Sequence, residues 1–133
     1  MDVLYFQFDG GPYALALEAV ADVTVAGAIQ QVPLSPPAVK GLAERRGRPV
    51  AVIDLPRLLD DGVSSGRPGA HLIRLARPLD GTALWVPAEV FSGDGIPASG
   101  TAVPEEAGHV FIDGRLHVLL DAGALVKRAA AYA

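Results

Sequence analysis

Two thirteen-residue stretches of this chain repeat one another. Residues 47–59 read GRPVAVIDLPRLL and residues 114–126 read GRLHVLLDAGALV. Each begins with Gly-Arg, reaches two aliphatic residues and an Asp, and ends on two more aliphatic residues. A second pair, at residues 11–20 and 81–90, shares a Gly, a hydrophobic run and a Glu near a closing Val. Two pairs of similar stretches that occur in the same order along the chain predict two related halves.

The bulk composition excludes several classes of protein. At 133 residues the chain is long enough for one domain with a substantial core. A net charge of −4 argues against a phosphate-backbone binder, so no nucleic-acid partner is expected. With no cysteine there is neither a disulfide nor a thiolate metal site. The first residues lack the basic and apolar regions of a signal peptide, and no apolar run is long enough to enter a membrane, so we expect a cytoplasmic protein.

Glycines and prolines divide the chain into short segments with strand-like alternation. Residues 3–8, 13–17 and 20–25 are expected to form the first three strands, and residues 49–54 another. Prolines at 33, 36 and 37 argue against a central strand and predict one helical turn over Ala38 to Ala43. Residues 56–59 predict a brief helix.

The second half predicts a similar series of short segments. Strands are expected at 71–76, 82–86, 109–113 and 115–120, with a hairpin turn at Asp113-Gly114. Residues 92–108 read as a polar connection, and residues 123–132 as a terminal helix.

This pattern predicts an all-β fold. Two halves, roughly residues 1–60 and 70–126 of a single domain spanning 1–133, would each supply about five strands to small barrels that share a core. Short helices and a C-terminal helix complete the expected architecture.

The matched Asp54 and Asp121 allow two interpretations. Aspartic proteases pair one Asp from each half of a pseudo-twofold, and Leu119-Leu120-Asp121-Ala122-Gly123 resembles their signature. The hydroxyl residue of that signature is missing, however, and no Gly follows Asp54. The favoured interpretation is that each Asp ends a strand and caps the next turn or helix.

Other reactive residue types give no convincing catalytic, cofactor or metal site. His71, His109 and His117 lack metal-ligand spacing, and the serines lie outside a nucleophile elbow. Trp85 is expected in the core. The distinctive segment is 40–48, KGLAERRGR, because arginine is enriched at protein interfaces.

Residues 41–55 and the order of elements around them resemble the CheW family of bacterial chemotaxis coupling proteins. The match runs from Gly41 through Arg46-Gly47 to Asp54-Leu55, and the closing segment from Asp113 to Asp121 also fits. The resemblance implies two SH3-like five-stranded barrels and a non-catalytic adaptor. Its partners would be the regulatory domain of a CheA-type histidine kinase and the cytoplasmic helical hairpin of a chemoreceptor.

The resemblance also assigns partner-binding positions. They are Val20, Asp22, Lys40, Gly41, Arg46 and Gly47. Val20 would supply apolar contact, Asp22 would pair with a cation, and Arg46 would bind a carboxylate or helix carbonyls. Glu44-Arg45 replaces the family's Asn-Leu, and Pro87 disturbs the equivalent motif of the second half. An alternative is a two-barrel protein-binding module used outside chemotaxis, and the hydrolase with Asp54 and Asp121 is another.

Overall fold

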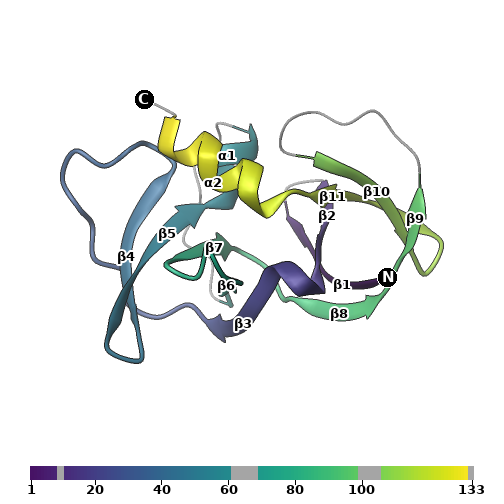
Figure 1. Ribbon diagram of the computed structural model, residues 1–133, viewed down its shortest axis with the longest axis horizontal. Helices are drawn as coiled ribbons and strands as arrows, with labels where there is room; N and C mark the ends of the chain where they lie inside the picture. The colour runs from purple at the N-terminus through teal and green to yellow at the C-terminus, as the bar shows by residue number, and fades with distance from the viewer. Residues whose placement is uncertain (9–10, 61–68, 99–105, 132–133) are drawn as a thin grey trace.

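Two strongly curled β-sheets lie side by side, with two helices above the contact between them (Figure 1). The structure is a computed structural model that describes residues 1–8, 11–60, 69–98 and 106–131. Barrel A contains, in spatial order, β8 (Phe91–Asp94), β1 (Asp2–Phe8), β2 (Gly11–Ala16), β11 (Arg115–Leu120), β10 (Glu106–Ile112) and β9 (Ile96–Ala98). Barrel B contains β3 (Val20–Val25), β6 (His71–Leu75), β7 (Thr82–Val86), β5 (Arg48–Asp54) and β4 (Val39–Arg45). The all-β prediction is confirmed.

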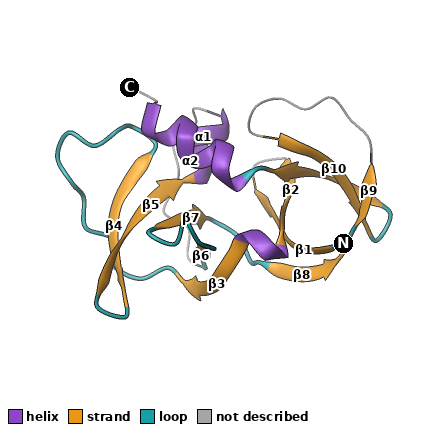
Figure 2. Ribbon diagram, viewed as in Figure 1, coloured by secondary structure: helices purple, strands orange, loops and turns teal. Residues whose placement is uncertain are grey.

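The helices are short and follow strands directly. A 3-10 turn, η1 (Leu17–Ala19), links β2 of barrel A to β3 of barrel B. Helix α1 (Leu55–Asp60) follows β5, and α2 (Ala122–Ala131) follows β11 (Figure 2). Within the described part of the chain, no helix has both the length and the apolar character needed to cross a membrane.

The two barrels repeat one pattern of strand pairing. In barrel A, β1 and β2 form an antiparallel pair, β2 runs parallel to β11, and β11 is antiparallel to β10. In barrel B, β6, β7, β5 and β4 are connected in the same way. Barrel A therefore takes β1 and β2 from the first half and the rest from the second, whereas barrel B takes β6 and β7 from the second half. Each barrel needs strands from both halves.

Positions 67 residues apart occupy equivalent places in these barrels. Gly41 and Gly108 both follow a register shift and both have positive φ, 151° and 119°. Gly47 and Gly114 both form the second residue of a two-residue hairpin turn, with φ of 79° and 78°. The offset matches the repeated Gly-Arg stretches. A duplication remains our interpretation of it, as do the two halves at 1–60 and 70–126.

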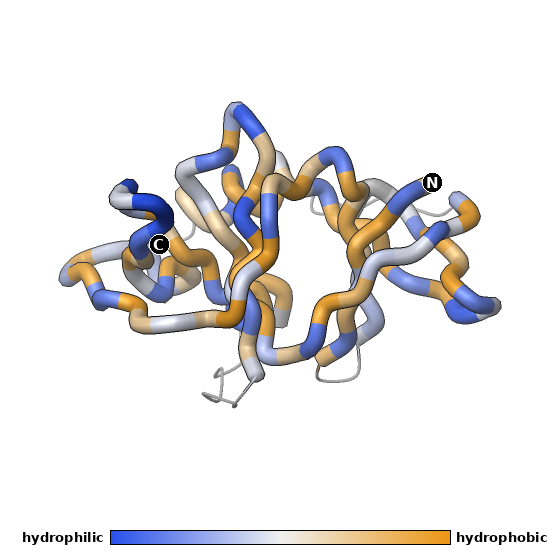
Figure 3. The backbone as a smooth tube through the Cα atoms, turned by 90° about the horizontal axis from the view of Figure 1, so that it is seen from below, coloured by the Kyte–Doolittle hydropathy of each residue, from blue (hydrophilic) through white to orange (hydrophobic). Residues whose placement is uncertain are grey.

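Strand β1 has buried residues on both of its faces. Leu4, Phe6 and Phe8 of β1 belong to the largest core cluster, together with Ile53 of β5 and Leu125 of α2. The alternate residue Val3 belongs to a second cluster inside barrel A. Hydrophobic and hydrophilic residues alternate over short distances along much of the chain (Figure 3). The largest cluster draws on both sheets and both helices, so neither barrel buries its apolar surface without the other.

Two local predictions were wrong. The helical turn expected over Ala38 to Ala43 is instead most of β4, because this segment pairs antiparallel with β5. The polar connection expected over 92–108 contains β8 and β9, and β10 begins at Glu106. Propensity at these glycines and prolines is outweighed by backbone pairing across the barrels. The sequence also predicts a turn at Asp9-Gly10-Gly11 and a loop rich in Gly, Ser and Asp over 60–69, and most of these residues lie outside the described part of the chain.

Candidate partner-binding surface

All six partner-binding positions predicted from the sequence lie on barrel B or at its junction with barrel A. The structure divides them into three places along β3 and β4. Asp22 contacts the residue preceding Arg46-Gly47, at one end of β4. Lys40-Gly41 lie near the other end, and five residues of extended chain place Lys40 and Arg45 roughly 16 Å apart. Val20 lies where β3 begins.

Asp22 is the centre of an ion cluster that joins three strands. Its Oδ2 accepts hydrogen bonds from Nε of Arg74 at 3.0 Å and from Nη2 of Arg74 at 2.8 Å. Nη2 of Arg45 lies 3.5 Å from the same oxygen. β3 and β4 are the two outer strands of barrel B. The contact between Asp22 and Arg45 therefore connects the two edges of the sheet and helps to close the barrel.

The same contacts determine the protonation of Asp22. Partial burial raises the pKa of this carboxyl, but the hydrogen bonds and charge of Arg74, with the charge of Arg45, lower it by more. The net effect is a pKa below the ordinary value for aspartate. The carboxylate stays charged at neutral pH and holds both guanidinium groups in place.

Arg46 and Gly47 form the turn between β4 and β5. Arg46 has φ of 52° and Gly47 has φ of 79°, the left-handed conformations that two-residue hairpins require. A glycine tolerates this conformation without steric cost. The Arg46 side chain is exposed, and within the described chain no ion pair holds it. A guanidinium group is thus presented to solvent from a rigid turn.

Lys40 lies over the ring of Trp85. Its Nζ is 4.2 Å from the ring centroid and 3.7 Å from Oδ2 of Asp54. Trp85 is 3% exposed, so the prediction of a core tryptophan is confirmed. Stacking on the ring and pairing with a buried carboxylate restrict the lysine, and both contacts strengthen as water is excluded.

Gly41 allows a second segment to approach β4. A Cβ built on Gly41 would lie 2.2 Å from the carbonyl oxygen of Gln30. Gln30 and Leu42 exchange two backbone hydrogen bonds of 2.8 Å beside it. The chain between β3 and β4 therefore pairs with the edge of β4 only because residue 41 has no side chain.

Val20 and the preceding turn lie where the barrels meet. Val20 is half-buried against the largest core cluster. Leu17, in η1, is 40% exposed. An apolar contact surface is available here beside the charged end of barrel B.

The two matched aspartates are capping residues. Oδ1 of Asp54 accepts a hydrogen bond from the backbone N–H of Arg57 in α1, at 3.3 Å. Oδ1 of Asp121 accepts one from the N–H of Ala124 in α2, at 3.0 Å. Asp54 is buried and Asp121 is exposed. The capping interpretation is confirmed, and each carboxylate is committed to its own helix.

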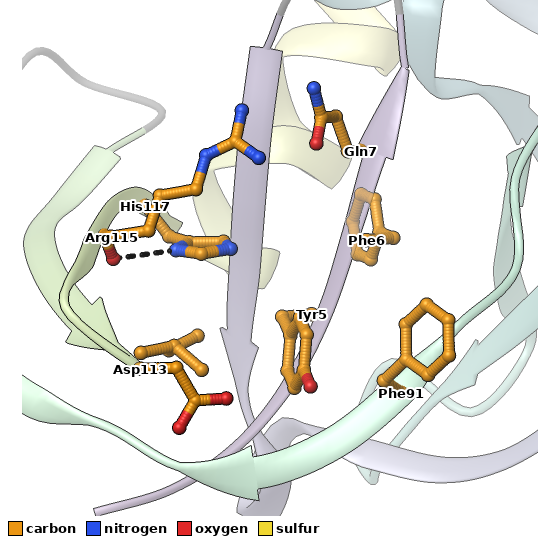
Figure 4. A pocket seen from close by; sticks show the side chains of 8 residues that line it. Tyr5, Phe6, Gln7, Phe91, Asp113, Arg115 and His117 are labelled. Carbon is orange, nitrogen blue, oxygen red and sulfur yellow. Dashed lines mark hydrogen bonds between the residues drawn. The ribbon is translucent and has the colours of Figure 1, made fainter.

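An aromatic pocket of about 280 Å³ opens on barrel A and was not predicted from the sequence (Figure 4). The rings of Tyr5 and Phe91 stack at 5.5 Å, and His117 meets the Tyr5 ring edge-on at 5.6 Å. His117 is buried, and its Nδ1 lies 3.0 Å from the carbonyl oxygen of Arg115.

Nδ1 of His71 lies 2.8 Å from the carbonyl oxygen of Ala88. Among the described residues, no group of acidic or histidine side chains could hold a metal ion.

Sequence reasoning also missed both partners of Asp22. The sequence places Arg45 in the arginine-rich segment 40–48 and marks it as a departure from the family pattern, and it does not single out Arg74. Side chains alternate between the two faces of the strand at residues 71–75, so Arg74 points away from the face that Ile73 and Leu75 occupy. This orientation is compatible with a surface position. The pairing of β3 with β6 across fifty residues is what brings Arg74 to Asp22.

A model of the CheW-like domain matches residues 2–76. The chain belongs to the CheW-like domain family. The scaffolding protein TtCheW from Thermoanaerobacter tengcongensis has a similar solved structure, with a TM-score of 0.77 and 21% identity. That match covers 93% of this chain and 86% of TtCheW, so the CheW-like fold extends over both barrels. A search of curated proteins finds no match.

Proposed function

We propose that this chain is a non-catalytic adaptor that couples a chemoreceptor to a CheA-type histidine kinase. The observation that carries the proposal is the match to the CheW-like domain over residues 2–76, which contain all six candidate binding residues. The two capping aspartates support it, because the pair that suggested a hydrolase has a structural role in each copy. The adaptor would need neither a cofactor nor a metal.

The kinase and the receptor would use different chemistry on this surface. Arg46 presents an exposed guanidinium group from a rigid turn, which suits a carboxylate or the exposed carbonyls at a helix end. Val20 and Leu17 offer apolar contact at the junction of the barrels, which suits one face of the receptor's helical hairpin. Lys40-Gly41 would form the far margin of the surface.

Asp22 has a different proposed role from the other five. Its carboxylate already accepts hydrogen bonds from Arg74 and lies beside Arg45, so a partner cation would have to share it. Asp22 would act by orienting these arginines toward a partner. The working place of such an adaptor is the cytoplasm, beside membrane receptor arrays, without insertion into the bilayer.

The test is calorimetric titration with the regulatory domain of the cognate CheA-type kinase and, separately, with a receptor hairpin. We expect micromolar binding to both. Arg46→Glu should weaken at least one interaction by about tenfold, because it replaces the paired hydrogen bonds of a guanidinium group with repulsion between two negatively charged groups. Lys127→Glu makes the same change of charge on the exposed surface of α2 and should leave both affinities unchanged.

Failure of the well-folded parent protein to bind either partner would overturn the adaptor proposal. Binding to both partners that is unaffected by Arg46→Glu would preserve the adaptor role but contradict the assigned surface. Thermal unfolding of each variant shows whether a loss of binding reflects a loss of folding.

A further inference from the structure

Four arginines from two segments surround one depression on barrel B. Arg45, Arg46 and Arg48 come from the β4–β5 hairpin and Arg74 from β6, and the depression has a volume of about 360 Å³. The turn between β6 and β7 completes it with Asp80 and Gly81. This turn is fixed to the hairpin by a hydrogen bond of 2.9 Å from the N–H of Ala51 to the carbonyl of Gly81.

The arrangement costs stability as it stands. Arg45 and Arg48 are directly opposite one another in the β4–β5 ladder. Like charges in such a pair repel, and most hairpins avoid them. Among the described residues, two carboxylates accompany the four arginines: Asp22 pairs with Arg45 and Arg74, and Asp80 lines the depression. Two of the four positive charges are therefore uncompensated.

One donor in the cluster also lacks an acceptor. The Nε–H of Arg45 is buried and has no hydrogen-bond partner. An unsatisfied buried donor is costly, and a charged one more so. Because Asp22 already fixes Arg45 and Arg74, the entropy of ordering these two side chains is lost before any ligand arrives.

Among its described residues, barrel A has no such cluster. At the equivalent hairpin, Asp113 occupies the place of Arg46, and Ile112 the place of Arg45. Only Arg115, equivalent to Arg48, is retained. The arginines are therefore a property of one barrel and not of the repeated hairpin.

We propose that this depression is a binding site for a small phosphate-bearing anion with two or more negative charges. Its oxygens would accept hydrogen bonds from the guanidinium N–H groups that line the depression, and its charge would offset the repulsion between Arg45 and Arg48. The volume exceeds that of a single phosphate and suits a diphosphate group. Guanidinium groups recognise phosphate with two parallel hydrogen bonds, so four of them favour it over monovalent ions.

The test is a titration of the protein alone with pyrophosphate at low ionic strength, followed by NMR of backbone amides and arginine Nε–H groups. We expect saturable shifts at Arg45, Arg48 and Arg74. Arg48→Gln should weaken binding by about tenfold, since it removes one guanidinium group, with its charge and its paired hydrogen-bond donors, from the site. Arg115→Gln is the matched control, at the equivalent position of barrel A, and should have no effect.

Two further probes define the ligand. ADP binding as tightly as pyrophosphate identifies the diphosphate as the recognised group, and markedly tighter ADP binding adds recognition of the nucleoside. Equal binding of citrate would overturn the assignment to phosphate. Absence of saturable shifts, or equal weakening by Arg48→Gln and Arg115→Gln, would overturn the site. The titration contains no kinase or receptor, so its result does not depend on the adaptor role.

Discussion

At the scale of single residues, the ion cluster of barrel B shows how one carboxylate organises a surface. Asp22 is bonded to Arg74 on the neighbouring strand and reaches Arg45 on the opposite edge of the sheet. Its partial burial makes these contacts stronger than those of an exposed ion pair. The cluster also holds two of the arginines of the proposed anion site.

Asp22→Asn should lower the free energy of unfolding by about 1–3 kcal/mol, because it leaves two partly buried arginines without their anion. The pKa of Asp22 is lower in the folded state than in the unfolded state, so its contribution is present above the unfolded pKa of about 3.9 and is lost as the pH falls through the folded pKa. Urea unfolding at neutral and at acidic pH measures both effects.

The difference between Asp22→Asn and the parent should shrink on acidification below this range. Asp113→Asn is the control, since Asp113 is exposed, and asparagine tolerates its φ of 50°. An equal loss of stability from both substitutions would argue against the cluster as the cause.

At the scale of elements, β4 depends on a glycine where two chain segments touch. Gly41 lies beside the bridge between Gln30 and Leu42, with a φ that side chains rarely adopt. In barrel A, Gly108 occupies the same place, and β9 supplies the outer strand that Gln30 only begins. The equivalent glycines thus let each barrel add backbone pairing at one edge.

Gly41→Ala should destabilise the protein by roughly 2–3 kcal/mol, because the new methyl group would overlap the Gln30 carbonyl and the backbone is strained for alanine. Gly81→Ala is the matched control, with no atom within 4 Å of the added Cβ, and should change stability by less than about 0.5 kcal/mol. Thermal or urea unfolding compares the two. Hydrogen exchange at Leu42 should accelerate only in Gly41→Ala, and unchanged exchange there would contradict the assigned bridge.

At the scale of the whole molecule, the exchange of strands between halves makes the barrels interdependent. The largest core cluster includes β1 of barrel A, β5 of barrel B and both helices. Leu125 of α2 is fully buried in it. An adaptor with two barrels of this kind presents its surfaces in a fixed relative orientation, because separating them would expose the shared core.

Leu125→Ala should cost about 2–5 kcal/mol, through lost burial and the cavity left behind. We expect both barrels to unfold in one transition at a lower denaturant concentration. Trp85 fluorescence reports barrel B, and the NMR signals of His117 report barrel A. Two separated transitions would show that the barrels are independent units. Lys127→Ala, on an exposed position of the same helix, is the control.

Local patterns in the amino-acid sequence are enough to predict the fold class, most strand positions and the role of the repeated aspartates. Short alternating segments and turn glycines are local signals, and they suffice to predict elements that depend on residues close together in the sequence. Asp54 and Asp121 were correctly interpreted because capping involves residues three positions apart. The family resemblance gave the two-barrel architecture and the candidate binding positions.

Long-range packing in the folded chain determines which strands form each barrel and which side chains meet. The exchange of β1–β2 with β6–β7 left no local signal, and neither did the pairing that makes residues 39–43 part of a strand. Arg74 and Arg45 both reach Asp22 through contacts between segments distant in the chain. Such contacts depend on register and barrel closure, which a periodic pattern does not encode.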